Sequence, residues 1–97
     1  MEVDDGLDDV RENLRGHVET ILEAGERAQA ITRECEEAFA EAQRTYNRRT
    51  ANSARKFEVG EITRHQHDLA MAFHEGCLRE KERRAVARRD ARLMAEI

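Results

Sequence analysis

At 97 residues, with four aromatic residues and 39% apolar residues, this chain is one small domain with little material for a core of its own. Charged residues also make up 39%, proline is absent and β-branched residues do not alternate as in strands, which is typical of long helices. The net charge of −4 hides 13 acidic and 4 basic residues in 1–41, against 8 acidic and 13 basic residues in 42–97. We therefore expect an all-α fold in which the two halves attract each other.

The composition also bears on the cellular compartment. The sequence has no apolar stretch of the ~20 residues that span a bilayer, and its acidic start is unlike a basic secretory leader. Two cysteines are too few for a disulfide framework. These features predict a cytoplasmic protein without membrane contact. The excess of arginine over lysine, 15 to 2, indicates a GC-rich genome, as in many bacteria and their phages.

Residues 1–6 are acidic and poor in apolar anchors, so we expect them to be frayed, and residues 7–49 are predicted to form the first helix. Two positions of a seven-residue repeat are mostly apolar: Leu7, Leu14, Ile21, Ala28, Cys35 and Ala42, and, three residues later, Val10, His17, Ala24, Ile31, Ala38 and Thr45. Such a seam needs a partner helix. The helix would be a rod of roughly 65 Å, too long for a compact globule of this size.

Residues 50–62 are the predicted turn, because Asn52 and Ser53 weaken a helix and Gly60 can adopt a positive φ. Thr63 and Gln66 have the spacing of a capping box, in which each side chain bonds the other residue's backbone amide. This predicts a second helix over residues 63–96. Folding it back so that paired residue numbers sum to about 112 places Phe73 on Phe39 and Cys77 on Cys35.

In this register the first turns of the long helix extend past the second helix, and their leucines need cover from another chain. We therefore expect residues 1–97 to form a single helical-hairpin domain that associates as a homodimer, in an antiparallel coiled coil or four-helix bundle. The residues expected to carry self-association are Leu7, Leu14, Ile21, Ile31, Phe39 and Phe73.

A basic segment with interleaved aromatic residues is expected at the hairpin tip. The residues expected to meet an outside partner there are Tyr46, Arg48, Arg49 and Phe57. The leading hypothesis is a non-enzymatic protein–protein interaction module, such as an adaptor, an inhibitor or an assembly factor. The alternative is a nucleic-acid-associated regulator that neutralises phosphates with this arginine-rich tip.

Histidine and cysteine residues early in the second helix raise a second alternative, a metal-binding bundle. The candidate ligands are Glu61, His65, Asp68, His74 and Cys77. The Glu-x-x-His and His-Glu-x-x-His signatures are absent, so we expect no metal or other cofactor. A phosphate-binding glycine loop and a nucleophile elbow are also absent, and we expect no enzymatic activity.

The segment from Phe57 to Thr63, followed by Leu69 and Ala70, contains a Gly-x-Ile-Thr step. It resembles a step found in helical hairpins, including those of outer-membrane efflux channels and a short bacterial C-terminal helical domain. The resemblance covers about a dozen residues and implies a helical hairpin, without a function.

Overall fold

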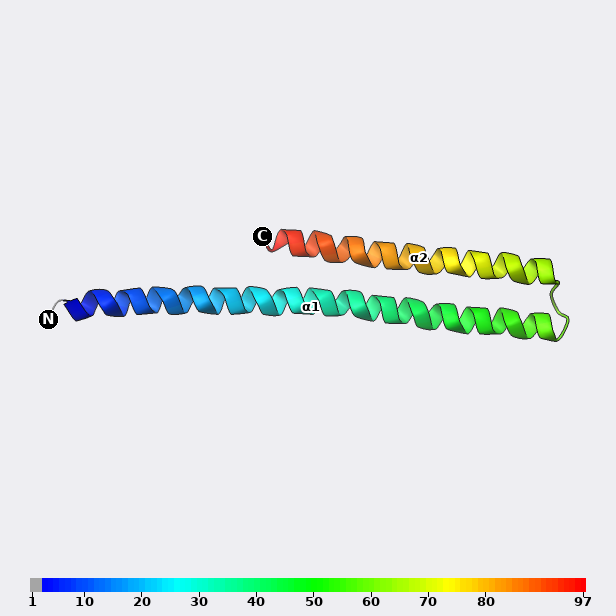
Figure 1. Ribbon diagram of the computed structural model, residues 1–97, viewed down its shortest axis with the longest axis horizontal. Coiled ribbons are helices and arrows are strands. Elements are labelled where there is room, and N and C mark those ends of the chain that lie inside the picture. The colour runs from blue at the N-terminus through cyan, green and yellow to red at the C-terminus, as the bar shows by residue number, and fades with distance from the viewer. Residues whose placement is uncertain (1–2) are drawn as a thin grey trace.

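The computed structural model describes the backbone of residues 3–97 and the side chains of residues 9–97. Two long antiparallel helices, α1 (Val3–Glu58) and α2 (Arg64–Ala95), are joined by a short loop over residues 59–63 (Figure 1). This part of the chain contains no strand, which confirms the all-α hairpin. The molecule measures 90 × 19 × 9 Å, and its radius of gyration of 25.0 Å is about twice the ~13 Å of a compact domain of this length. The hairpin is therefore a rod of two helices.

Helix α1 is longer than the sequence suggests. Of residues 1–6, expected to be frayed, residues 3–6 belong to α1 and residues 1–2 lie outside the described part. Residues 50–58, assigned to the turn by sequence, also continue the helix, so the expected turn is too long by nine residues. Ser53 does not break the helix because its buried hydroxyl hydrogen-bonds the Nδ1 of His67 on α2, at 2.8 Å. Serine has a low intrinsic helix propensity, but Ser53 here makes a contact between the two helices.

The loop is closed by a cap on each side. Gly60 has a φ of 79°, as expected, and the amides of Gly60 and Glu61 donate to the carbonyls of Phe57 and Lys56, which is the Schellman pattern. Thr63 then opens α2 with the predicted capping box: its hydroxyl accepts from the Gln66 amide at 3.1 Å, and its own amide donates to Oε1 of Gln66 at 2.9 Å. Together the two caps reverse the chain within residues 59–63.

The register predicted from the sequence is wrong, and the position of the loop explains why. Ser53 pairs with His67, and Arg27 with Glu96, so paired numbers sum to 120 and 123 instead of 112. Moving the turn from about residue 56 to about residue 61 shifts every partner by roughly three helical turns. Phe73 therefore does not cover Phe39, and Cys77 lies beside Ala42 and Thr45 instead of Cys35.

The core between the helices is a narrow line of small residues. The buried side chains among those described are Ile31, Cys35, Ala42, Thr45 and Ser53, all on α1, whereas α2 buries none of its residues completely. The first four occupy the two apolar positions of the predicted repeat, which confirms this part of the seam. Both cysteines are free thiols. Neither helix within residues 3–97 has a stretch long and apolar enough to cross a bilayer.

Candidate interaction surfaces

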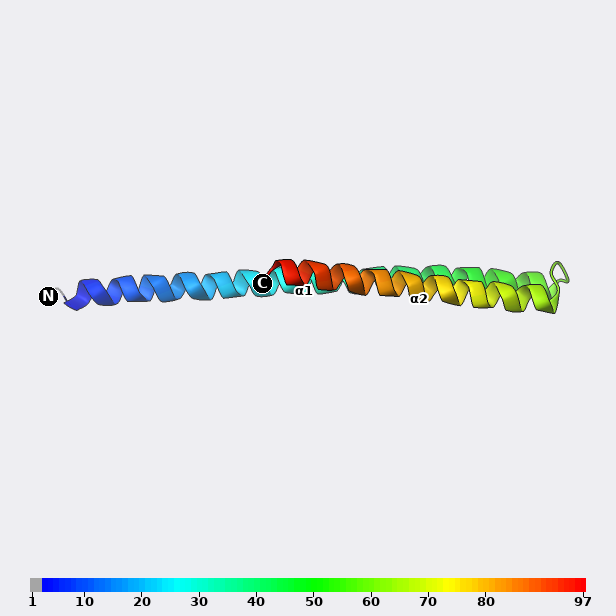
Figure 2. The same ribbon diagram turned by 90° about the horizontal axis from the view of Figure 1, so that it is seen from above.

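The N-terminal part of α1, residues 3–26, has no partner helix within the described chain. Helix α2 ends beside Arg27, whose guanidinium contacts Glu96 at 2.8 Å, so α1 continues alone from there towards its N-terminus (Figures 1 and 2). We call residues 3–26 the overhang. At 1.5 Å per residue it is about 36 Å long, which is some three turns longer than the predicted register implies.

The overhang carries an aliphatic stripe that is open to solvent. Its members, 53% to 69% exposed, are Val10, Leu14, Val18, Ile21 and Leu22. They recur at helical spacing on one face, which is the face that α2 covers further along α1, at Ile31 and Cys35. The acidic residues Glu12, Glu19, Glu23 and Glu26 fall on the opposite face. An exposed aliphatic stripe of this length is typical of an interface.

The residues predicted for self-association do not form one surface. Leu14 and Ile21 belong to the exposed stripe, and Leu7 lies in the overhang but outside the described side chains. Ile31, 4% exposed, is already part of the core, and Phe39 is half-buried. Phe73 is 66% exposed on α2. The stripe therefore includes two of the five predicted residues whose side chains are described.

The residues predicted for an outside partner do not cluster at the tip. Because α1 runs to Glu58, about 18 Å of helix separates Tyr46 from the loop. Tyr46 is half-buried beside Cys77 and Lys81, whereas Arg48 and Arg49 are exposed. Phe57 is the only one of the four near the loop, and its ring stacks on that of His67 with centroids 5.3 Å apart. The expectation of one compact arginine-rich tip is therefore wrong.

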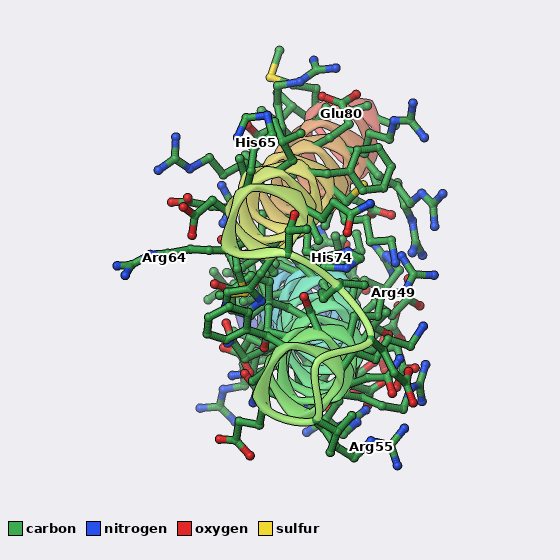
Figure 3. All side chains as sticks on the ribbon, turned by 90° about the vertical axis from the view of Figure 1, so that its right-hand side faces the viewer. Arg49, Arg55, Arg64, His65, His74 and Glu80 are labelled. Carbon is green, nitrogen blue, oxygen red and sulfur yellow. The ribbon has the colours of Figure 1, made fainter. Side chains whose placement is uncertain are left out.

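One edge of the hairpin instead carries basic groups from both helices. Near the loop, Arg49 and Lys56 line a shallow cavity of about 250 Å³ with His74, and no carboxylate lines it. Further along the rod, Lys81, Arg84 and Arg88 line a second cavity of about 310 Å³ with the carboxylate of Glu41. We call these five basic residues the basic edge. Figure 3 shows Arg49 and His74 on the same side of the gap between the helices, with Arg64 pointing away on the other side.

Most members of the basic edge are free of carboxylate partners. Among the described side chains, Arg49, Lys56, Lys81 and Arg88 form no ion pair, whereas Arg84 contacts Glu80 at 3.0 Å. Sequence reasoning did not include Lys81 and did not place these basic residues on one edge of the hairpin. The signal was available in their spacing, because residues 49 and 56, and residues 81 and 88, are each seven apart. Only the correct register brings the two pairs to one edge.

The other charged groups pair mainly within one helix. The guanidinium of Arg83 donates to Glu80 and lowers the pKa of that carboxyl, and Arg44 does the same for the pKa of Glu41. Between the helices, the described ion pairs are Arg27 with Glu96 and Arg92 with Glu34. The hydrogen bond from Arg27 to Glu96 raises the pKa of that guanidinium. Of the predicted attraction between the acidic first half and the basic second half, the described side chains show one direct ion pair, from Arg92 to Glu34, and Lys81 adds a longer-range attraction to Glu41.

The candidate metal ligands are spread along the start of α2 and the loop. Glu61, His65 and Asp68 are exposed, while His74 and Cys77 are half-buried between the helices. Nowhere among the described residues do three His, Cys, Asp or Glu side chains come close enough to hold one ion. The buried Nδ1 of His74 has no hydrogen-bond partner. This nitrogen lies beside the cavity lined by Arg49 and Lys56.

Comparison of the chain with family models, with characterised proteins and with solved structures finds no match.

Proposed function

We propose that this chain is a non-enzymatic protein–protein interaction module that acts as a homodimer. The observation that supports the proposal is the overhang, a single helix whose aliphatic stripe from Val10 to Leu22 is left uncovered by the rest of the chain. An isolated helix in water gains little from its backbone hydrogen bonds alone, so packing of this stripe would supply most of its stability. A second molecule of the same chain carries the same stripe and could provide that packing.

The charge on the outer faces argues for a contact restricted to the overhang. The four-helix bundle expected from the sequence would bury an outer face of α2 that carries Arg79, Arg83 and Arg84, all exposed and paired with nearby glutamates. Removing such ion pairs from water costs more than their attraction returns unless each is well compensated. The overhang requires no such burial, because its stripe is aliphatic.

The dimer would present two loop ends to other proteins. Near each loop, Val59, Leu69 and Phe73 are between 58% and 66% exposed. Large apolar side chains of this kind supply most of the binding energy when a partner covers them. An adaptor or assembly factor with two such ends could hold two partner molecules at a fixed separation.

The test of self-association is the double variant Leu14→Asp with Ile21→Asp, which places two carboxylates in the stripe. We expect the variant to sediment at half the mass of the unmodified chain, because a charge cannot be buried in an aliphatic contact without a partner. The control is Ala40→Asp with Ala51→Asp, two exposed positions of α1 outside the overhang. This control adds the same charge and should remain dimeric. An unmodified chain that stays monomeric at micromolar concentration refutes the proposal.

A nucleic-acid-associated function is the second candidate, and the basic edge supports it. Its five basic residues line two cavities along the rod, and the carboxylates beside them are Glu41, which lines one cavity, and Glu80, which is paired with Arg84. Phosphate groups bind to such an array through release of counterions, and this binding weakens steeply with salt.

Two matched variants test the second candidate. Lys81→Glu with Arg88→Glu should abolish a mobility shift of duplex DNA or RNA at low salt. The control, Arg79→Glu with Arg83→Glu, changes the charge equally at residues that are paired with glutamates on α2, and should retain most of the binding. No shift of either nucleic acid at low salt excludes this function.

A further inference from the structure

We propose that the two overhangs of the dimer pair antiparallel, with residues facing each other when their numbers sum to 31. The inference rests on the proposed self-association and specifies its geometry. In this register Val10 faces Ile21 of the second copy and Leu14 faces His17, each layer occurring twice about a two-fold axis between residues 15 and 16. The axis lies at about the middle of the overhang, so the stripe residues Val10, Leu14 and Ile21 of both copies lie in the contact.

The position of α2 excludes the parallel arrangement. Three members of the stripe, Val10, Leu14 and Ile21, occupy the same two repeat positions as the buried residues Ile31 and Cys35, so this part of the stripe lies on the face of α1 that contacts α2. A parallel second α1 packed on the stripe would run into α2 at Arg27, where α2 ends. An antiparallel second α1 runs the other way and leaves the rod beyond the first chain's N-terminus. The N-terminal end of each α1 then lies next to the C-terminal end of α2 of the other copy.

The charges agree with this register. The acidic residues Glu12, Glu19, Glu23 and Glu26 lie on the face opposite the stripe, so they point away from the second copy. At the flanks of the contact the neighbouring residues are displaced by two positions from the core layers, so Asn13 lies beside Thr20 and Arg11 beside Val18, which brings no two like charges together. The low charge of the flanks removes the main obstacle to pairing two acidic segments.

The ends of the helices are also complementary at the two junctions. Residue 4 of the second copy falls level with Arg27, next to the C-terminal end of α2. The negative end of the α2 dipole therefore meets the positive end of the second α1. Opposite partial charges of the helix ends at both junctions favour this arrangement.

The geometry predicts which cysteines can be cross-linked. In a background of Cys35→Ala with Cys77→Ala, the full chain is made with Val10→Cys alone and with Ile21→Cys alone. Mixing and oxidising the two variants should give a covalent dimer, because Val10 faces Ile21. Each variant oxidised alone should give none, since its two cysteines lie about 16 Å apart along the rod, too far for a disulfide. Circular dichroism of each variant checks that the helices are retained.

Three results would overturn the inference, and they separate it from the proposed function. A covalent dimer of Val10→Cys alone would show parallel pairing. A chain that sediments as a dimer but forms no cross-link in any sample would show another contact surface, and self-association would stand. A chain that sediments as a monomer would remove both proposals.

Small-angle scattering gives an independent measure. Two 90 Å hairpins that overlap by about 36 Å form a particle roughly 145 Å long. Hairpins packed side by side would remain near 90 Å. A maximum dimension near the shorter value therefore contradicts the antiparallel overhang.

Discussion

Ser53 is a buried polar residue between α1 and α2, and its contact with α2 determines its structural role. Serine disfavours a helix interior because its hydroxyl competes for backbone groups. Here the hydroxyl contacts Nδ1 of His67 at 2.8 Å instead, and the ring of His67 stacks on Phe57. The three side chains fix the two helices relative to each other one turn before the loop. Sequence propensity alone could not distinguish this role from that of a helix breaker.

Replacing Ser53 by alanine should lower the free energy of unfolding by about 1 kcal/mol, because the hydrogen bond to His67 is lost in a buried position. Urea unfolding followed by circular dichroism measures the change. The control is Thr20→Ala, whose hydroxyl bonds only the Gly16 carbonyl of its own helix in the exposed overhang. That variant should change the unfolding free energy by less than about 0.5 kcal/mol. Equal effects of the two substitutions would contradict the role given to Ser53.

The elements show which features could be predicted from sequence and which could not. The two helices, the positive φ of Gly60 and the Thr63 capping box follow from local chemistry and are confirmed. The register is not local, because it depends on where the chain reverses. Reading Asn52 and Ser53 as the start of the turn placed its centre about five residues early, and an antiparallel hairpin doubles that error. The basic edge was not predicted for the same reason, because it combines basic residues of α1, such as Arg49, with basic residues of α2, such as Lys81, and their relative positions depend on the register.

Two glycine-to-alanine substitutions should change stability in opposite directions. Gly60→Ala places a side chain at a φ of 79° and should destabilise the protein by about 1 kcal/mol. Gly76→Ala lies within α2 with open space around the added carbon, and should stabilise it by about 0.5–1 kcal/mol. The midpoints of thermal unfolding of the two variants should therefore lie on opposite sides of that of the unmodified chain. A raised midpoint for Gly60→Ala would show that the Schellman loop does not depend on Gly60.

The whole molecule consists of two regions with different requirements for stability. Residues 27–96 form a hairpin whose core lies within the chain, whereas residues 3–26 depend on a second molecule in the proposed dimer. The stability of the overhang should then depend on protein concentration, and that of the hairpin should not. Such a difference distinguishes association through the overhang from a bundle formed along the whole rod.

Hydrogen exchange at several protein concentrations should reveal the two regions. Amides of residues 9–24 should become more protected as the concentration rises through the dimer dissociation constant, because packing against the second copy makes local unfolding of the helix less favourable. Amides near Ile31, Ala42 and Ser53 should change little. Uniform protection of the entire α1 helix at all concentrations would contradict the division into two regions. The Leu14→Asp with Ile21→Asp variant serves as a reference, since its overhang should exchange quickly throughout.

The line of small buried residues along α1 has a consequence for how this protein can vary. Cys35, Ala42 and Ser53 are small side chains buried between the two helices, where the close packing of an interior leaves little room for a larger side chain. A bulky substitution at any of these points would spread the helices over much of their shared length, whereas most outward positions tolerate exchange freely. Mutational tolerance should thus be lowest at a few small side chains and not at the few aromatic ones.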